Sequence, residues 1–129
     1  MSLNGRAEIQ AKLKADSNVT DLIGTYLSAP AIYSNPMTPS SYTGDAITMY
    51  LSSPTIAGYQ IGSYNITVNC YSEDYTNVEL IQQAVFESLN EKRYNDYYFV
   101  CSKLTVIPSG EISSFHNAPV EVLARNRNL

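Results

Sequence analysis

The sequence predicts an α+β fold in which an antiparallel sheet of about four strands packs against one long helix, with a helical elbow at the N-terminus. Two patterns predict this class. Apolar and polar residues alternate in several segments, as in strands with one buried face. One long segment instead carries apolar residues at helical spacing. With 129 residues and 44% hydrophobic content, the chain is sized for one core, so we expect a single domain over residues 1–129.

The N-terminal part predicts the helical elbow. Ile9 and Leu13 are four residues apart among good helix formers, which favours a helix over about 5–15. An Asp-Ser-Asn stretch then breaks this helix, and a short second turn ends at Gly24, a residue type common at helix C-termini. We therefore expect two short helical pieces rather than one long helix.

Residues 28–45 form the longest irregular stretch of the sequence. Pro30, Pro36 and Pro39, together with many Ser and Thr residues, resist regular structure there. Irregular connections longer than roughly 12 to 15 residues are uncommon in compact domains, and they often act as binding loops or mobile arms. We expect an extended Pro- and Ser-rich arm at about 28–45, which is either an interface or a plain surface loop.

Strand-like alternation occurs in four segments, namely 47–51, 60–71, 98–106 and 118–124. The outward positions of the second segment are polar, which favours antiparallel pairing with one face in water. Pro119 favours an edge or strand-start position for the last segment, because proline cannot donate a backbone hydrogen bond.

The long helix is predicted over about 77–90, where apolar residues recur at helical spacing from Val78 to Leu89. Thr76 and Glu79 have the spacing of a capping box, in which a Ser or Thr side chain caps the helix N-terminus. We therefore expect Thr76 to be the capping residue.

Charge is segregated along the chain. The net charge is -4, yet residues 15–91 contain eight acidic residues and no Lys or Arg, whereas 1–14 and 92–129 are each net +2. A protein that grips duplex DNA neutralises phosphates with clustered Lys and Arg, and no such cluster is present in the sequence. The acidic stretch is either a solvated face or a surface that repels nucleic acid or meets a basic partner.

The sequence carries no motif for catalysis, a metal or a cofactor. Cys70 and Cys101 lie in apolar, strand-like runs, where free cysteine behaves as a small hydrophobe. His116 is the only histidine, and its spacing supports neither zinc binding nor a Cys-His dyad. Glu73 and Asp74 precede the long helix, a position where acids are stabilised by the helix dipole. We therefore expect no enzyme, with no catalytic, metal or cofactor residue.

Tyrosine is unusually abundant, with 11 Tyr against 3 Phe and no Trp. Tyrosine is enriched at protein interfaces, whereas stacking on single-stranded nucleic acid needs basic neighbours that the tyrosine-rich middle lacks. The alternative is that the tyrosines are spread singly over an ordinary surface. If they mark an interface between copies, our candidates are Tyr33, Met37, Tyr42, Tyr50 and Tyr71.

The sequence also indicates where in the cell the protein is located. Residues 1–16 lack the apolar stretch of a signal peptide, and no run approaches the roughly 18 apolar residues of a transmembrane helix. We expect a protein made and kept in the cytoplasm, with no membrane partner.

Several segments together resemble a known family. The stretches Ala-Glu-Ile-Gln-Ala-Lys-Leu-Lys-Ala-Asp (7–16), Asn-Val-Thr-Asp-Leu-Ile-Gly (18–24) and Ala-Ile-Tyr (31–33) resemble the opening of the tail-terminator, or tail-completion, proteins of tailed bacteriophages and prophages. The strand 64–71 with its Tyr-Ser exit, the following helix and the closing strand are similar to that family as well. The resemblance covers about 7–125.

The sequence departs from the family at two places. Gly-Asp-Ala stands at 44–46, where the family has a Pro-Tyr entry to its first long strand, and the Pro-rich arm is longer.

The resemblance implies a non-enzymatic virion protein that forms a ring, commonly a homohexamer, at the head-proximal end of the tail. Such a ring stops the tail tube from growing and joins it to the head. The implied partners are further copies of the chain, the tail tube protein and the head–tail connector protein, with DNA passing through unbound after assembly in the host cytoplasm. Carboxylates in the base-free stretch then face the lumen; the candidates are Asp45, Glu73, Asp74 and Glu87.

Two other classes remain open. A head–tail connector or head-closure component of the same virion shares ring assembly and differs in its partners. A small ligand-binding module instead uses Tyr33, Tyr42 and the loop to form a pocket. Stabilisation by a ligand favours the module, whereas rings that form without ligand favour a virion part.

Overall fold

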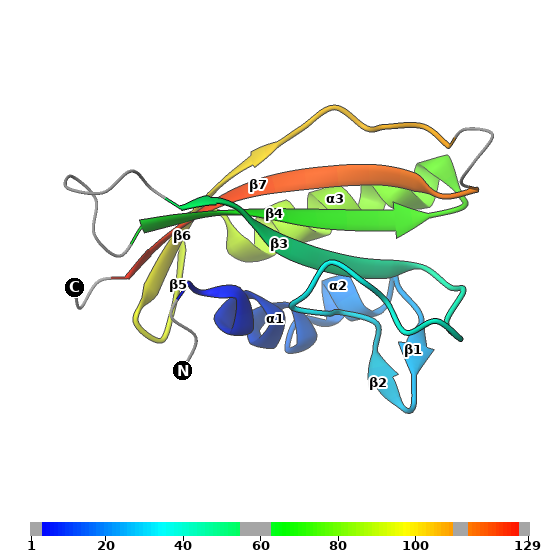
Figure 1. Ribbon diagram of the computed structural model, residues 1–129, viewed down its shortest axis with the longest axis horizontal. Coiled ribbons are helices and arrows are strands. Elements are labelled where there is room, and N and C mark those ends of the chain that lie inside the picture. The colour runs from blue at the N-terminus through cyan, green and yellow to red at the C-terminus, as the bar shows by residue number, and fades with distance from the viewer. Residues whose placement is uncertain (1–3, 55–62, 110–113, 127–129) are drawn as a thin grey trace.

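The computed structural model describes residues 4–54, 63–109 and 114–126 (Figure 1). The elements in these ranges confirm the α+β class. In chain order they are α1 (Arg6–Lys14), α2 (Ser17–Thr20), β1 (Thr25–Tyr26), β2 (Ala29–Pro30), β3 (Ala46–Pro54), β4 (Ser63–Ser72), α3 (Tyr75–Leu89), β5 (Lys92–Tyr94), β6 (Tyr97–Lys103) and β7 (His116–Asn126).

The main sheet is antiparallel, with the order β3-β4-β7-β6-β5. It therefore has five strands rather than about four. The additional strand, β5, has only three residues, too few to show alternation in the sequence. β7 comes last in the chain but lies between β4 and β6, and this places Val68 opposite Val120 and Cys101 opposite Val122.

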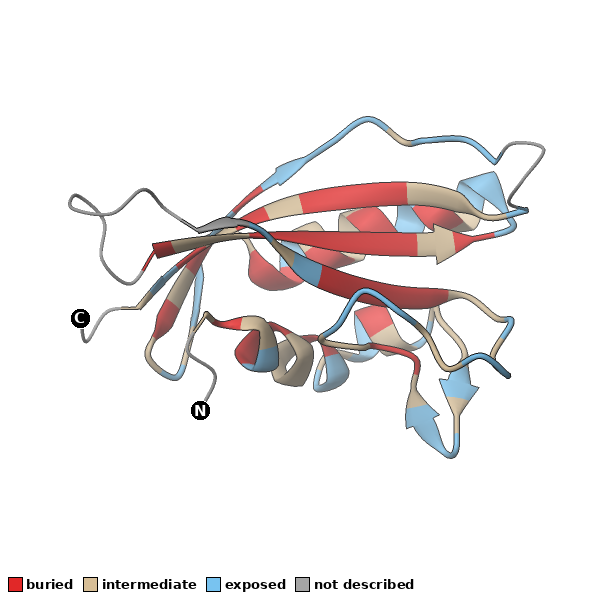
Figure 2. Ribbon diagram, viewed as in Figure 1, coloured by how far each residue is buried: buried red, intermediate tan, exposed pale blue. Residues whose placement is uncertain are grey.

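The core lies between one face of the sheet and the helices, as the buried stretches in Figure 2 show. α3 contacts β4, β6 and β7, and α1 contacts both α3 and β3. Every second residue of each long strand points into this core, as the alternation predicts. The fully buried core side chains include Ile9, Leu13, Ile47, Met49, Ile66, Val68, Ile81, Val85, Leu89, Phe99, Val120 and Val122.

Asp74, and not Thr76, caps the long helix. The Asp74 side chain accepts hydrogen bonds from the backbone N–H groups of Thr76 and Asn77, at 2.9 and 3.3 Å. The helix thus begins at Tyr75, and the capping-box prediction was wrong. A carboxylate accepts these bonds more strongly than a neutral hydroxyl and also interacts favourably with the helix dipole.

Pro119 lies in the central strand β7, so the prediction of an edge position was wrong. Its carbonyl oxygen accepts hydrogen bonds from Leu104 N at 3.1 Å and from Gln82 Nε2 at 2.9 Å. The N–H and C=O of a residue in an antiparallel strand point to the same side, here that of β6. Leu104, the residue after the last pair of β6, lies opposite Pro119, and its carbonyl oxygen cannot receive the usual return bond because proline has no N–H. That oxygen instead accepts from Gln82 Nε2 at 2.8 Å, which compensates for the missing ladder bond.

The predicted arm begins with a small hairpin and then runs along the free edge of β3. The hairpin β1–β2 projects from the body of the molecule (Figure 1). After it, Ile47 N donates to Ala31 O and Tyr33 N donates to Ile47 O, both at 2.9 Å. From α1, Gln10 Nε2 donates to Ile32 O at 2.8 Å. These bonds fix residues 31–33 against the first half of β3.

The turn of the β1–β2 hairpin has an unusual sequence for its backbone. Tyr26 pairs with Ala29, and the two residues between them, Leu27 and Ser28, have φ of 52° and 66°. Two-residue turns with positive φ at both positions favour Asn and Gly, since other side chains clash there. The Leu27 side chain is 83% exposed, so packing within the described chain does little to offset the strain of this conformation.

Candidate interaction surface

The sheet face opposite the helices, here named the outer face, carries polar and aromatic side chains. Strand registers define rows across it. One row, near the end of β7, contains Arg93, Tyr98 and Arg125. A row near the other end contains Ala46 and Tyr71. The outer face therefore runs from a basic row at one end of the strands to an aromatic one at the other.

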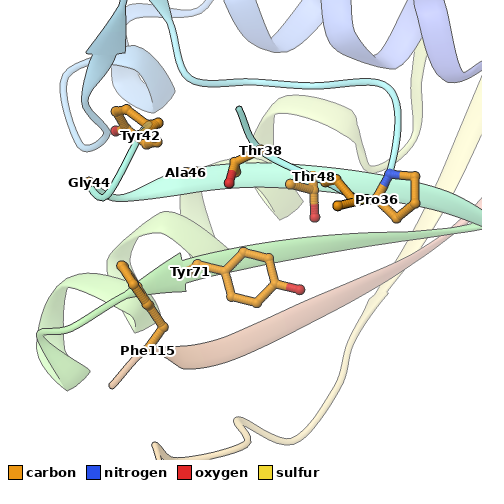
Figure 3. A pocket seen from close by; sticks show the side chains of 9 residues that line it. Pro36, Thr38, Tyr42, Gly44, Ala46, Thr48, Tyr71 and Phe115 are labelled. Carbon is orange, nitrogen blue, oxygen red and sulfur yellow. The ribbon is translucent and has the colours of Figure 1, made fainter. Parts of the chain in front are cut away.

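A cavity of about 340 Å³ lies on the outer face beside the start of β3 and the end of β4 (Figure 3). The segment before β3 forms one wall, the two strands form the floor, and the residue before β7 closes the far side. Its lining residues are Pro36, Met37, Thr38, Tyr42, Gly44, Ala46, Thr48, Tyr71 and Phe115.

Tyr42 is fixed in the wall of this cavity. Its hydroxyl donates to the backbone oxygen of Asp45 at 2.5 Å, and its ring meets that of Tyr26 edge-on, with centroids 6.0 Å apart. Burial raises the pKa of Tyr42, and the neighbouring Asp45 charge adds to this shift. Burial likewise raises the pKa of Tyr71, opposed by the nearby Thr48 hydroxyl. Both phenols therefore stay protonated at neutral pH.

Thr48 provides an unusual polar group in the floor. Its side chain is 1% exposed, and its hydroxyl is the hydrogen-bonding neighbour that lowers the pKa of Tyr71. Buried hydroxyls in folded proteins are nearly always hydrogen-bonded, because an unpartnered one costs about 1 to 3 kcal/mol. The buried Thr48 hydroxyl thus helps to position Tyr71 in the floor of the cavity.

The structure brings three of the five predicted interface residues together. Met37, Tyr42 and Tyr71 line the cavity. Tyr50 is 41% exposed on the same outer face, opposite Thr67. Tyr33 lies on the segment beside β3 and is not in the lining.

Sequence reasoning did not single out Thr48 or Phe115. Thr48 has the pattern of an ordinary outward strand residue. Phe115 approaches the cavity only because β7 pairs with β4, and no local pattern encodes that pairing.

Three of the four predicted lumen carboxylates lie at one end of the strands. Asp45 precedes β3, and Glu73 and Asp74 follow β4, the antiparallel neighbour of β3. Asn77 Nδ2 donates to Asp45 Oδ2 at 2.7 Å, and this links Asp45 to the start of α3. We call Asp45, Glu73 and Asp74 the acidic end. Glu87 lies further along α3, about 20 Å from Asp74 at the rise of an α-helix.

The opposite end of the strands is basic. Lys92 and Arg93 are exposed on β5, and Arg125 is exposed near the end of β7, in the same row as Arg93 and Tyr98. We call Lys92, Arg93 and Arg125 the basic end. Glu91 and Asp96 flank the bases of β5, and Lys103 ends β6 at the acidic end, so the two ends of the sheet differ in net charge without either being of one sign.

The described residues contain no arrangement suited to nucleophilic catalysis. Cys70 and Cys101 are free thiols on β4 and β6, and β7 separates the two strands. Burial raises the pKa of both, that of Cys101 to about 12, so neither forms the reactive thiolate at neutral pH. His116 Nδ1 accepts a hydrogen bond from Ser109 N at 2.9 Å, and its ring packs edge-on against Tyr75.

The described residues include no group of three or more His, Cys, Asp or Glu side chains placed to hold a metal ion. Within the same ranges, no helix has both the length and the apolar character needed to cross a bilayer.

The fold and the outer-face surface together define an α+β protein with a candidate binding surface and charged ends. No family model matches the sequence, and no curated protein does. A chain in the structure of the virion of the native gene transfer agent particle shares the fold, with a TM-score of 0.68 and 16% identity. The match covers 94% of this chain and 92% of that chain, so the likeness extends over nearly the whole domain.

Proposed function

We propose that this chain is a structural protein of a phage-like virion, and specifically a tail terminator. The observation that carries the proposal is the shared fold with a chain of the gene transfer agent virion, over 94% of the present chain. The resemblance of residues 7–125 to tail-terminator proteins points in the same direction. In this role a ring of copies, commonly six, caps the tail tube at its head-proximal end and joins it to the head–tail connector.

The geometry of the surface suits such a ring. A closed ring needs two different patches on each subunit that are complementary to one another. The acidic and basic ends lie at opposite ends of the same strands and differ in net charge. DNA passes through the centre without specific binding, for which an acidic lumen is favourable, because grip on DNA requires phosphate neutralisation.

A tube-length experiment tests this role directly. The chain is added to polymerising tail tube protein, and tube lengths are measured by negative-stain electron microscopy. We expect short, uniform tubes with a ring at one end, and native mass measurements of the chain alone should show rings at high concentration. Tubes of unchanged length with no bound ring would contradict the tail-terminator role; binding to the connector alone would favour a head-closure component instead.

The cavity favours one alternative, a small ligand-binding module. Its lining is mostly aromatic and apolar with a few polar groups, which is the kind of lining that binds small molecules. A thermal-shift screen against sugars and aromatic compounds separates the two roles. A ligand that stabilises a persistent monomer in proportion to its concentration supports the module.

A further inference from the structure

The β1–β2 hairpin ends in the most exposed large apolar side chain of the described residues. Leu27, at the first position of the two-residue turn, is 83% exposed. The hairpin projects from the body of the molecule, so its tip stands clear of the rest of the chain (Figure 1). A single exposed leucine is ordinary on a protein surface. This one is unusual because of the backbone that carries it.

The conformation of the turn lowers the stability of the free chain. Leu27 and Ser28 have φ of 52° and 66°, in the left-handed region where a residue with a Cβ is strained. Strained residues of this kind cluster at binding and active sites. Because Leu27 is exposed to water, folding gains little from its apolar surface. That surface becomes stabilising only when another molecule buries it.

The base of the hairpin is held firmly, so the tip is presented in one position. The hydroxyl groups of Tyr26 and Ser41 share a hydrogen bond of 2.8 Å, and the Tyr26 ring meets that of Tyr42 edge-on. At the foot of the hairpin, Gly24 N donates to Asp45 O at 3.2 Å. A contact element that is ordered before it binds loses less conformational entropy on binding. The hairpin therefore presents Leu27 as a preorganised anchor.

The charges near the hairpin indicate the chemistry of its partner. Asp21 is exposed shortly before the hairpin, and Asp45 lies at its foot. Residues 15–91 contain no Lys or Arg that could neutralise these carboxylates. Partner surfaces are complementary in charge, because like charges that face one another oppose binding. A pocket that takes Leu27 is therefore apolar inside and bordered by basic groups.

A second copy of the chain does not match this description. The cavity on the outer face is mostly apolar, but its lining contains no Lys or Arg. The partner of the hairpin is therefore a protein of different sequence.

We propose that Leu27 anchors this chain to another protein of the virion, by insertion into an apolar pocket that basic groups border. The class of partner rests on the proposed function, which supplies two neighbours, the tail tube protein and the head–tail connector protein. The contact is separate from the association of copies into a ring, because it joins the chain to a different protein.

Two substitutions within the same turn separate the side chain from the backbone. Leu27→Asn and Ser28→Gly each place a residue suited to positive φ, so both should raise the melting temperature. Only Leu27→Asn removes the anchor. We expect it to weaken binding to the partner at least about tenfold, as the loss of one buried leucine side chain does. Ser28→Gly should bind as the original chain does.

Binding is measured with two probes, assembled tail tubes and the purified connector protein, by co-sedimentation over a range of chain concentrations. Leu80→Gln is a further control, since it removes another leucine, 52% exposed on α3, and leaves the hairpin unchanged. Sedimentation velocity measures self-association, which should be the same in every variant. Loss of binding together with a gain in stability supports the anchor, because loss of a purely structural residue lowers stability.

Asp21→Lys tests the basic border of the pocket. It reverses an exposed charge near the hairpin and should weaken binding about threefold at low salt, with the melting temperature as the check on folding. Binding that is unchanged or tighter would contradict a basic border.

Several results would overturn the proposal. They are binding of Leu27→Asn to both probes at the original strength, an equal loss of binding by Ser28→Gly, and loss of self-association by Leu27→Asn, which makes a second copy the partner. Tube capping that survives Leu27→Asn, with connector binding also unchanged, would contradict the anchor and leave the tail-terminator role intact. Binding to the connector alone, through Leu27, would support the anchor and contradict that role. Binding to neither probe would contradict both.

Discussion

At the scale of single residues, the two buried cysteines make the stability of the fold depend on pH. In an unfolded chain a thiol titrates near pH 8.5, whereas burial in this fold raises the pKa of Cys70 and raises that of Cys101 to about 12. Above about pH 8.5 the unfolded chain therefore loses protons that the folded chain keeps. The contribution of the two thiols to the free energy of unfolding is therefore complete below about pH 8.5 and decreases as the pH rises above it.

We expect the free energy of unfolding to fall by about 2 to 3 kcal/mol between about pH 8 and about pH 9.5. Urea denaturation at the two pH values measures this; tyrosine, whose ordinary pKa is about 10, is only partly ionised at the upper value and contributes less than the two thiols. The Cys70→Ala variant is the control, because it should be less stable at both values and show about half of the decrease. An unfolding free energy that does not change over this range would contradict the burial of the thiols.

At the scale of elements, the β1–β2 hairpin carries the clearest local conflict between sequence and backbone. Leu27 and Ser28 both adopt positive φ, a conformation that costs about 1 to 2 kcal/mol for such residues. The β5–β6 hairpin instead places Asn95 at its positive φ, a residue type that tolerates it. The two hairpin turns therefore differ: the β1–β2 turn places unsuited residues at positive φ and is strained, whereas the β5–β6 turn places a suited residue there.

Replacement of Leu27 and Ser28 by Asn and Gly should stabilise the isolated chain by about 1 to 2 kcal/mol, because this pair fits the turn without strain. The shift of the urea midpoint measures the gain. Asp96→Gly, at a turn position without positive φ, is the control and should give no gain. A double variant no more stable than the original chain would show that the turn is not strained.

Most elements could be predicted from the sequence, and the reasons for the exceptions are physical. α3, β3, β4, β6 and β7 show apolar periodicity over enough residues to be recognised. β1, β2 and β5 have only two or three residues each, too few for a periodicity to show in the sequence.

At the scale of the whole molecule, the separation of charge has a measurable consequence. Association between the acidic and basic ends should weaken with salt, because exposed charges are screened within about 10 Å at about 0.1 M ionic strength. We expect the association constant to fall roughly tenfold between about 50 mM and about 500 mM NaCl, measured by light scattering. Association that strengthens with salt would indicate a mainly apolar contact elsewhere.

The candidate surface could be predicted only in part. The abundance of tyrosine drew attention to Tyr42 and Tyr71, which the fold gathers around one cavity together with Met37. Thr48 and Phe115 could not be found in this way, because they join the cavity through the pairing of strands distant in sequence. The grouping of carboxylates at one end depends on the same pairing.

The insertion of β7 between the strands of the two cysteines has a consequence for the covalent structure of the chain. Cys70 and Cys101 are held on β4 and β6, so the folded chain cannot join them in a disulfide. Its covalent structure is then the same in a reducing cell interior and in an oxidising medium. Transfer of the folded chain from the first environment to the second would therefore leave its covalent structure unchanged.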